Sequence, residues 1–277
     1  MSTVQKTVKR AKYPSDMSAN GWLKIKDKLP KPKNDTKVGG RPAESLREII
    51  NGIFYVIKEG CSWRGIPHDL PNWSTVYGYY SRWSKDGTWE FIHTFLVKKI
   101  REQEGRKKRP SAGSIDSQTT KGTSCGGEDR GYDGGKHIKG RKRFILVDTM
   151  GLLLAAWVCA GSVSEKAGAM QLLTYIKSKA HLSDLCRRIK LVWVDGGYRG
   201  EDLLNWVKNL WGWTWQVVVR SDDAKGFQLL PRRWVVERTF SWLVQNRRLN
   251  KEYEKKTKNS QSMVYIASIK MMLNRLN

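Results

Sequence analysis

The chain has 277 residues, and its 51 Lys and Arg against 26 Asp and Glu give a formal net charge of +25. A surplus of positive charge this large predicts a polyanionic partner, most often nucleic acid. The dispersed four Cys and four His exclude the common zinc spacings and argue against a disulfide framework, and no apolar run is long enough for a membrane span.

Residues 1–40 are polar and carry ten Lys and Arg against three acids. Pro30, Pro32 and the pair Gly39-Gly40 interrupt any regular pattern in this segment. We interpret it as a flexible basic arm, with a short helix at 22–28, that adds contacts to phosphates. A disordered tail without a partner is the alternative.

Residues 41–105 are predicted to form a small helical domain. Pro42 suits the first position of a helix, which Gly60 ends, and Asn72 caps a second helix that reaches residue 83. With a third helix at 88–101, the segment resembles a helix-turn-helix bundle that binds DNA; a helical dimerisation module is the alternative. On the DNA-binding interpretation, the exposed face of the second helix carries Ser74, Thr75, Tyr77, Ser81 and Arg82.

Residues 101–110 form a charged linker, and beyond it the sequence pattern changes to that of strands. We expect strands at 112–117, 143–149, 152–159, 191–194 and 213–220, and helices at 165–180, 201–210, 231–249 and 260–276. Three successive strands followed by alternating helices and strands predict an α/β domain over residues 110–277. Its mixed sheet would have helices on its faces.

Two aspartates lie where predicted strands end. Asp195 follows the buried run 191–194 and precedes a Gly-Gly turn, and Asp116 follows the strand that begins at residue 112. If these strands are neighbours, both carboxylates project from one edge of the sheet, where a hard divalent cation such as Mg²⁺ relieves their repulsion. The alternative for Asp195 is that it caps the helix that follows.

Glu237 is a third candidate carboxylate, on the helix predicted at 231–249. At about 100° per residue it lies beside the buried stripe of that helix, with Arg233 on one side and Arg248 on the other. A carboxylate between two guanidiniums suits a metal held beside a phosphodiester. An ordinary salt bridge within the helix is the alternative.

Taken together, these motifs closely resemble the IS5 family of bacterial insertion-sequence transposases, within the IS4-like DDE group. The resemblance runs from about residue 41 to the C-terminus and includes Gly60-Cys61-Ser62-Trp63-Arg64, which is similar to the helical domain of those enzymes. It rests on Ser114–Gln118, Gly131–Asp133, Gly140–Arg143, Val147–Thr149, Val194–Gly200 and Trp234–Leu243 followed by Arg247-Arg248.

The resemblance implies an RNase H-like sheet flanked by helices, with Asp116, Asp195 and Glu237 as catalytic and metal-binding residues. It further implies two Mg²⁺ ions, with Mn²⁺ as an alternative, that support phosphoryl transfer. The implied partners are double-stranded DNA, both terminal inverted repeats and target DNA, and a second copy of the chain in a synaptic homodimer. The implied location is the bacterial cytoplasm, on the nucleoid, with no membrane partner.

The chain departs from the wider group's pattern of Tyr, Arg, Glu and Lys around the catalytic Glu. Arg233 and Glu237 fit that pattern, but Leu230 stands at the Tyr position and Val244 at the Lys position. Arg247 or Arg248 is expected to supply the missing cation.

Further contacts with DNA are expected on either side of the aspartates. The Gly-rich segment 119–142 and the residue after it carry Lys136, Lys139, Arg141, Lys142 and Arg143, which we expect to touch the DNA backbone; a solvated loop is the alternative. Tyr198 and Arg199, next to Asp195, are also expected to contact DNA. Asp148, near another strand end, is interpreted as structural.

Two other functions remain compatible with the sequence. One is a DNA-binding regulator on the same fold that does not catalyse a reaction. The other is an RNase H-like nuclease that cuts DNA without joining it.

Overall fold

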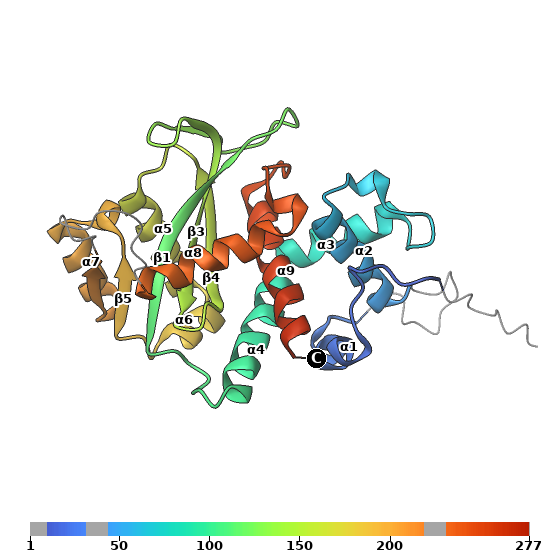
Figure 1. Ribbon diagram of the computed structural model, residues 1–277, viewed down its shortest axis with the longest axis horizontal. Coiled ribbons are helices and arrows are strands. Elements are labelled where there is room, and N and C mark those ends of the chain that lie inside the picture. Colours follow the sequence, from blue (N-terminus) through green and yellow to red (C-terminus); the bar gives the residue numbers. More distant parts are fainter. Residues whose placement is uncertain (1–9, 32–43, 219–230, 277) are drawn as a thin grey trace, which may run out of the picture.

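The computed structural model describes residues 10–31, 44–218 and 231–276. Within these residues, one curled mixed sheet has the strand order β2-β3-β1-β5-β6, and β4 pairs with β3 on the same edge as β2 (Figure 1). The strands are β1 (Ala112–Lys121), β2 (Gly131–Asp133), β3 (Ile138–Asp148), β4 (Leu153–Ala160), β5 (Leu191–Val194) and β6 (Thr214–Val217).

The direction of each strand follows from its connection. β3 is antiparallel to both β1 and β4, whereas β5 is parallel to β1, and β6 is parallel to β5. Parallel neighbours need a crossover, and α5 (Glu165–Ser178), α6 (Ala180–Cys186) and α7 (Glu201–Trp211) provide the helices for it. The predicted mixed α/β sheet with flanking helices is therefore confirmed.

Helices pack against the sheet on several of its strands. α5 and α6 pack on β4, and α8 (Pro231–Val244) packs across β1, β3 and β5 (Figure 1). The interior of β3 is apolar, and its residues 144–147 have no exposed surface. Among the described residues, no helix is both long and apolar enough to cross a membrane.

The helical half contains α2 (Leu46–Glu59), α3 (Trp73–Asp86) and α4 (Thr88–Gln103), close to the three predicted helices. Gly60 ends α2 in the left-handed conformation with φ 74°, and the side chain of Asn72 accepts a hydrogen bond from the Ser74 N–H at 2.9 Å. The C-terminal helix α9 (Thr257–Arg275) packs against α2, α3, α4 and β4, so it lies between the helical half and the sheet (Figure 1). Buried apolar residues consequently form one continuous core.

Residues 10–31 pack against the body of the protein, which differs from the expected free arm. Arg10 pairs with Asp16 and with Glu48 at 2.8 Å each, and Asn20 donates to the carbonyl of Leu276 at 3.2 Å. The segment forms α1 (Ala19–Ile25) and a 3-10 turn, with Ile25 buried. Arg10 and Asp16 thus have partners within the chain, which a count of charges does not reveal. The rest of the expected arm lies outside the described residues.

Candidate active site

Asp116 and Asp195 lie side by side at one edge of the sheet. β1 pairs in parallel with β5, with Ser114 opposite Trp193, and the same offset brings Asp116 level with Asp195. Asp116 is half-buried, and it accepts a hydrogen bond from the N–H of Ser117 at 2.8 Å. The neighbouring strands thus bring the two aspartates together. Asp195 directly follows the end of β5, as predicted, whereas Asp116 lies inside β1, which continues to Lys121.

The electrostatic surroundings of Asp116 favour its protonated form. Its pKa is raised to about 6, mainly by burial and also by the charge of Asp195, against the lowering effects of the Ser117 N–H, Arg233 and Lys136. Two adjacent carboxylates with too little positive charge around them are a suitable place for a hard cation.

Asp195 makes two different contacts with its two oxygens. Oδ1 accepts the Gly197 N–H at 2.8 Å and caps the 3-10 turn η3 (Gly196–Tyr198). Oδ2 lies 3.7 Å from Nη2 of Arg233. Asp195 therefore caps this 3-10 turn and not the following helix α7, whose N-cap is Gly200, and its other oxygen faces α8.

Glu237 reaches this edge through Arg233, one turn earlier on α8. Nη2 of Arg233 lies 3.3 Å from Oε1 of Glu237, which is exposed. The predicted ion pair with Arg233 is present, and the same guanidinium also contacts Asp195. In the described part of the chain, no three His, Cys, Asp or Glu side chains gather closely enough to hold one metal ion. The hard oxygen donors of Asp116 and Asp195 nevertheless suit Mg²⁺ or Mn²⁺.

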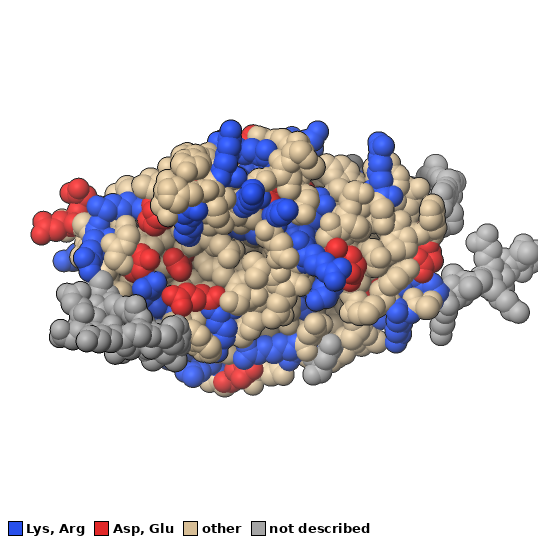
Figure 2. Space-filling view, turned by 45° about the horizontal axis from the view of Figure 1, so that its top comes forward, with Lys and Arg blue, Asp and Glu red and all other residues tan. Residues whose placement is uncertain are grey.

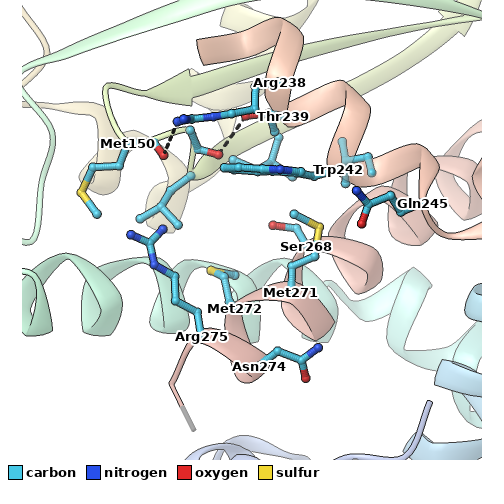
Figure 3. A pocket seen from close by; sticks show the side chains of 14 residues that line it. Met150, Arg238, Thr239, Trp242, Gln245, Ser268, Met271, Met272, Asn274 and Arg275 are labelled. Atoms are coloured by element: carbon cyan, nitrogen blue, oxygen red, sulfur yellow. Dashed lines mark hydrogen bonds between the residues drawn. The ribbon is translucent and has the colours of Figure 1, made fainter. Parts of the chain in front are cut away.

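The position of α8 is set by contacts to the turn between β3 and β4. Arg238 donates to the carbonyl of Met150 at 3.4 Å, and Thr239 donates to the carbonyl of Gly151 at 3.0 Å (Figure 3). Trp242 lies beside them, over a pocket of about 520 Å³ that is also lined by residues of α9. These contacts hold the helix that carries Glu237 against the sheet.

Arg248 is not the second guanidinium beside Glu237, and this prediction is wrong. The helix ends at Val244, and a 3-10 turn, η4 (Arg247–Leu249), follows it, so helical geometry cannot be extended to residue 248. Arg248 is buried and pairs with Glu254 at 2.8 Å. Arg247 is exposed and lies 3.5 Å from Glu59.

The basic segment before and within β3 divides into two groups. Lys136 and Lys139 are exposed, and Lys136 is close enough to Asp116 to lower its pKa. The expected DNA contacts of the next three cations are wrong, because β3 starts earlier than predicted and buries all three: Arg141, Lys142 and Arg143.

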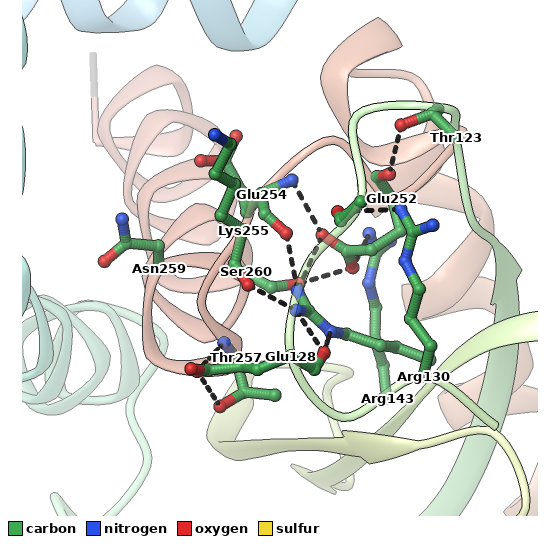
Figure 4. A network of polar contacts seen from close by, with 12 residues as sticks. Thr123, Glu128, Arg130, Arg143, Glu252, Glu254, Lys255, Thr257, Asn259 and Ser260 are labelled. Carbon is green, nitrogen blue, oxygen red and sulfur yellow. Dashed lines mark hydrogen bonds and ion pairs between the residues drawn. The ribbon is translucent and has the colours of Figure 1, made fainter.

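The two buried arginines of β3 have partners in the connection between η4 and α9, for which the sequence predicts no contact (Figure 4). Arg141 and Arg143 both pair with Glu252 at 3.4 Å, and Arg141 also donates to the carbonyl of Glu254 at 2.8 Å. Lys142 pairs with Glu165 at 3.0 Å. The spacing of these residues does not reveal the pairing, because both arginines pair with the same Glu252 and residue 254 contributes only its backbone carbonyl to Arg141.

The residues after Asp195 also divide into two groups. Tyr198 has no exposed surface, and its ring lies 6.4 Å from that of Trp215, so the expected DNA contact of this side chain is wrong. The aromatic ring fills space under the sheet edge instead. Arg199 is exposed.

Asp148 is structural, as interpreted. It is fully buried, pairs with Arg101, and accepts hydrogen bonds from the N–H groups of Met150 and Leu152 at 2.9 Å each. It therefore shapes the turn on which α8 rests. It lies on β3, away from the paired ends of β1 and β5.

On α3, the predicted DNA-facing residues differ in exposure. Ser74, Tyr77 and Arg82 are exposed, whereas Thr75 and Ser81 are half-buried. The guanidinium of Arg82 lies 5.1 Å from the ring centre of Tyr79. A polar face is present on this helix.

Comparisons with known proteins agree with this arrangement. A family model for the transposase DDE domain matches residues 107–272. This range is more than half of the chain and includes all three carboxylates. The class defined by the fold and this match is that of the DDE transposases. A model described as a transposase of the IS4/5 family matches residues 17–93, and the chain belongs to that family.

A curated relative supports the same family. It is the uncharacterized 16.2 kDa protein of insertion element IS402 from Burkholderia cepacia, 34% identical over 83 residues. The match covers 29% of this chain and 56% of the relative, so the chain spans about half the length of that relative. No solved structure matches the chain.

Proposed function

We propose that this protein is a DNA transposase in which Asp116, Asp195 and Glu237 are the catalytic, metal-binding residues. The observation that carries the proposal is the level placement of Asp116 and Asp195 on parallel strands. Arg233 supports the third assignment because it contacts both Asp195 and Glu237. The strand order supports the RNase H-like fold that the resemblance implies.

The three carboxylates would hold two Mg²⁺ or Mn²⁺ ions. When bound, such ions would lower the pKa of the attacking water or hydroxyl group and neutralise negative charge on the leaving oxygen. The chain itself contributes the position of the substrate. Lys136 and Arg233 bring positive charge to the same edge as the aspartates, and exposed Arg199 follows Asp195, so the three suit the phosphates next to the reacting one.

The DNA partner is proposed to be double-stranded. Figure 2 shows Lys and Arg side chains along the length of one face of the molecule, where acidic side chains are fewer. We assign recognition of the terminal inverted repeats to the helical segment 41–105 and its exposed face on α3, and backbone contact to Lys136, Lys139 and Arg199. Synapsis of two element ends, followed by joining to target DNA, would use a homodimer on the bacterial nucleoid.

The test is cleavage and joining of labelled element ends by Asp195→Asn and Glu237→Gln. Phosphoryl transfer depends on positioning and charge neutralisation, so each variant should lose activity while binding of the ends is retained. Glu201→Gln, an exposed carboxylate on α7, is the matched control and should remain active. Normal turnover by either variant would contradict the assignment. Cutting without joining by the wild type would indicate a nuclease, and binding without cutting would indicate a regulator.

A further inference from the structure

A basic hollow lies at the end of the sheet opposite the aspartates. It has a volume of about 590 Å³ and is lined by cations from the segment before β1 and the segment before β5, with Glu102 as its acidic lining residue. We call it the basic cleft, and its cations are Lys107, Lys108, Arg109, Arg187, Arg188 and Lys190.

Two of these arginines fix the shape of the cleft. Arg109 pairs with Asp184 at 2.6 Å, and its carbonyl accepts a hydrogen bond from Nη1 of Arg188 at 2.7 Å. The N–H of Lys190 donates to the carbonyl of Ser111 at 2.8 Å, which joins the two segments again. The walls are therefore built by specific contacts between segments far apart in the sequence.

The other cations of the cleft are left facing solvent. Lys108 pairs with Glu102 at 3.0 Å, and Arg187 lies 3.6 Å from Asp184. Lys107 and Lys190 are exposed, and no acidic group among the described residues pairs with either. Six cations thus surround the two carboxylates of Glu102 and Asp184, and no other acidic side chain of residues 10–31, 44–218 and 231–276 pairs with the cations of the cleft.

The basic cleft is separate from the candidate active site. It lies where β1 and β5 begin, whereas Asp116 and Asp195 lie where their pairing ends. Asp116 lies four positions after Ala112 on the strand, which is about 13 Å at 3.3 Å per residue. In Figure 1, the connection from α4 to β1 runs along the lower edge of the molecule. A phosphate held among the aspartates cannot also lie in this cleft.

The lining of the cleft indicates what it binds. Pockets for small molecules are mostly apolar and aromatic, whereas the side chains lining this hollow are all charged. Lys and Arg without an aromatic platform suit a row of phosphates, and contacts to phosphates carry no sequence information directly. An extended backbone of phosphates matches that chemistry better than a nucleotide does.

We propose that the basic cleft binds the phosphate backbone of duplex DNA, independently of sequence, outside the segment held at the aspartates. This inference deepens the proposed function and rests on it, because it assigns a second contact for the same class of partner. The cleft would hold duplex away from the reacting phosphodiester and leave the aspartates accessible to it.

The test compares Lys107→Ala/Lys190→Ala with the wild type for binding to a random-sequence duplex over a range of salt concentrations. The slope of log K against log salt is negative, and each lost phosphate contact reduces its magnitude by about 0.9. The magnitude of the slope should therefore be about 1.8 smaller for the double variant than for the wild type. Lys208→Ala/Lys256→Ala removes the same charge from exposed positions elsewhere and should leave the slope unchanged. All four lysines are exposed, so equal unfolding midpoints confirm that the variants fold.

Several results would overturn the inference. One is an unchanged slope in the double variant, and another is an equal loss in the control pair, which would reflect net charge alone. If polyglutamate competes for the cleft as well as DNA of the same charge does, the partner would be an acidic protein instead of DNA. If the wild type binds no duplex, the proposed function also fails; if it binds and only the slope test fails, the cleft alone is wrong.

Discussion

Nη2 of Arg233 lies 3.7 Å from Oδ2 of Asp195, and this contact joins α8 to the end of β5. The same nitrogen lies 3.3 Å from Oε1 of Glu237. One guanidinium therefore neutralises two of the three proposed metal ligands. A divalent ion that binds these oxygens must compete with Arg233 for them.

Arg233→Gln should consequently raise the affinity for divalent ions. A partly exposed ion pair contributes about 0.2–1 kcal/mol, which corresponds to about a 1.4- to fivefold lower Mn²⁺ concentration at half-saturation. The measurement is the rise of the thermal unfolding midpoint with Mn²⁺ at pH 8. Arg199→Gln, an exposed arginine near the same edge, controls for net charge. Equal or weaker Mn²⁺ affinity in Arg233→Gln would show that the guanidinium does not compete with the ion.

Asp116→Asn should stabilise the protein at alkaline pH and remove its activity. The folded-state pKa of about 6 lies above the ordinary 3.8, because burial, together with Asp195, favours the protonated form. The stability that this proton contributes is complete below pH 3.8 and is lost as pH rises through 6. At pH 8 the ionised carboxylate therefore costs at most about 3 kcal/mol, a cost that Asn does not carry.

Urea unfolding in the presence of a chelator checks this expectation. Asp116→Asn should unfold at a higher urea concentration than the wild type at pH 8, with a much smaller difference at pH 4.5. The exposed Asp27, changed to Asn, should show no such dependence on pH. A variant that is equally destabilised at both pH values would mean that the carboxylate contributes hydrogen bonds rather than repulsion.

The sequence predicts that the two aspartates come together better than it predicts which charged side chains pair with one another. Asp195 could be placed because it follows the apolar run 191–194, whereas Asp116 lies inside a longer strand than predicted and meets Asp195 through the pairing of β1 with β5. Arg141 and Arg143 were misjudged because their partner, Glu252, comes from a connection after α8. Charge is visible in a sequence, whereas burial of that charge depends on contacts made across the fold.

The end of a helix caused a different error. Arg248 was placed beside Glu237 by extending one helical period, but the chain leaves the helix after Val244. Tyr198 was misjudged for a third reason, since a tyrosine in a Gly-rich turn can face either solvent or core. In the structure the ring of Tyr198 packs against Trp215 on β6 and faces the core.

Arg82→Ala should weaken binding to the terminal repeat more than binding to random DNA. Arg82 is exposed on α3, on the helix that we propose reads the repeat. A side chain that makes a good bidentate base contact contributes about 1–3 kcal/mol of discrimination, so competition gel shifts at fixed salt should show at least about a fivefold preferential loss. Lys85→Ala, an exposed cation on the next turn, should reduce both affinities alike. Equal losses for Arg82→Ala would identify it as a backbone contact.

Gly168 and Gly78 should respond in opposite ways to replacement by Ala. Both lie inside helices, where Ala is favoured over Gly by about 0.8–1 kcal/mol. A Cβ at Gly168 on α5 would overlap the ring of Phe144 in β3, whereas a Cβ at Gly78 on α3 would have no neighbour within 4 Å. Overpacking costs about 1–3 kcal/mol, so Gly168→Ala should be destabilised on balance and Gly78→Ala stabilised.

Urea unfolding of the two variants measures the difference. Adding Phe144→Leu to Gly168→Ala should recover part of the loss, since the smaller side chain makes room for the methyl group, and the double-mutant cycle isolates that coupling. Stabilisation of both single variants would mean that α5 can move away from β3 at little cost. Because β3 pairs with the strand that carries Asp116, such freedom would also leave the spacing of the aspartates less firmly set.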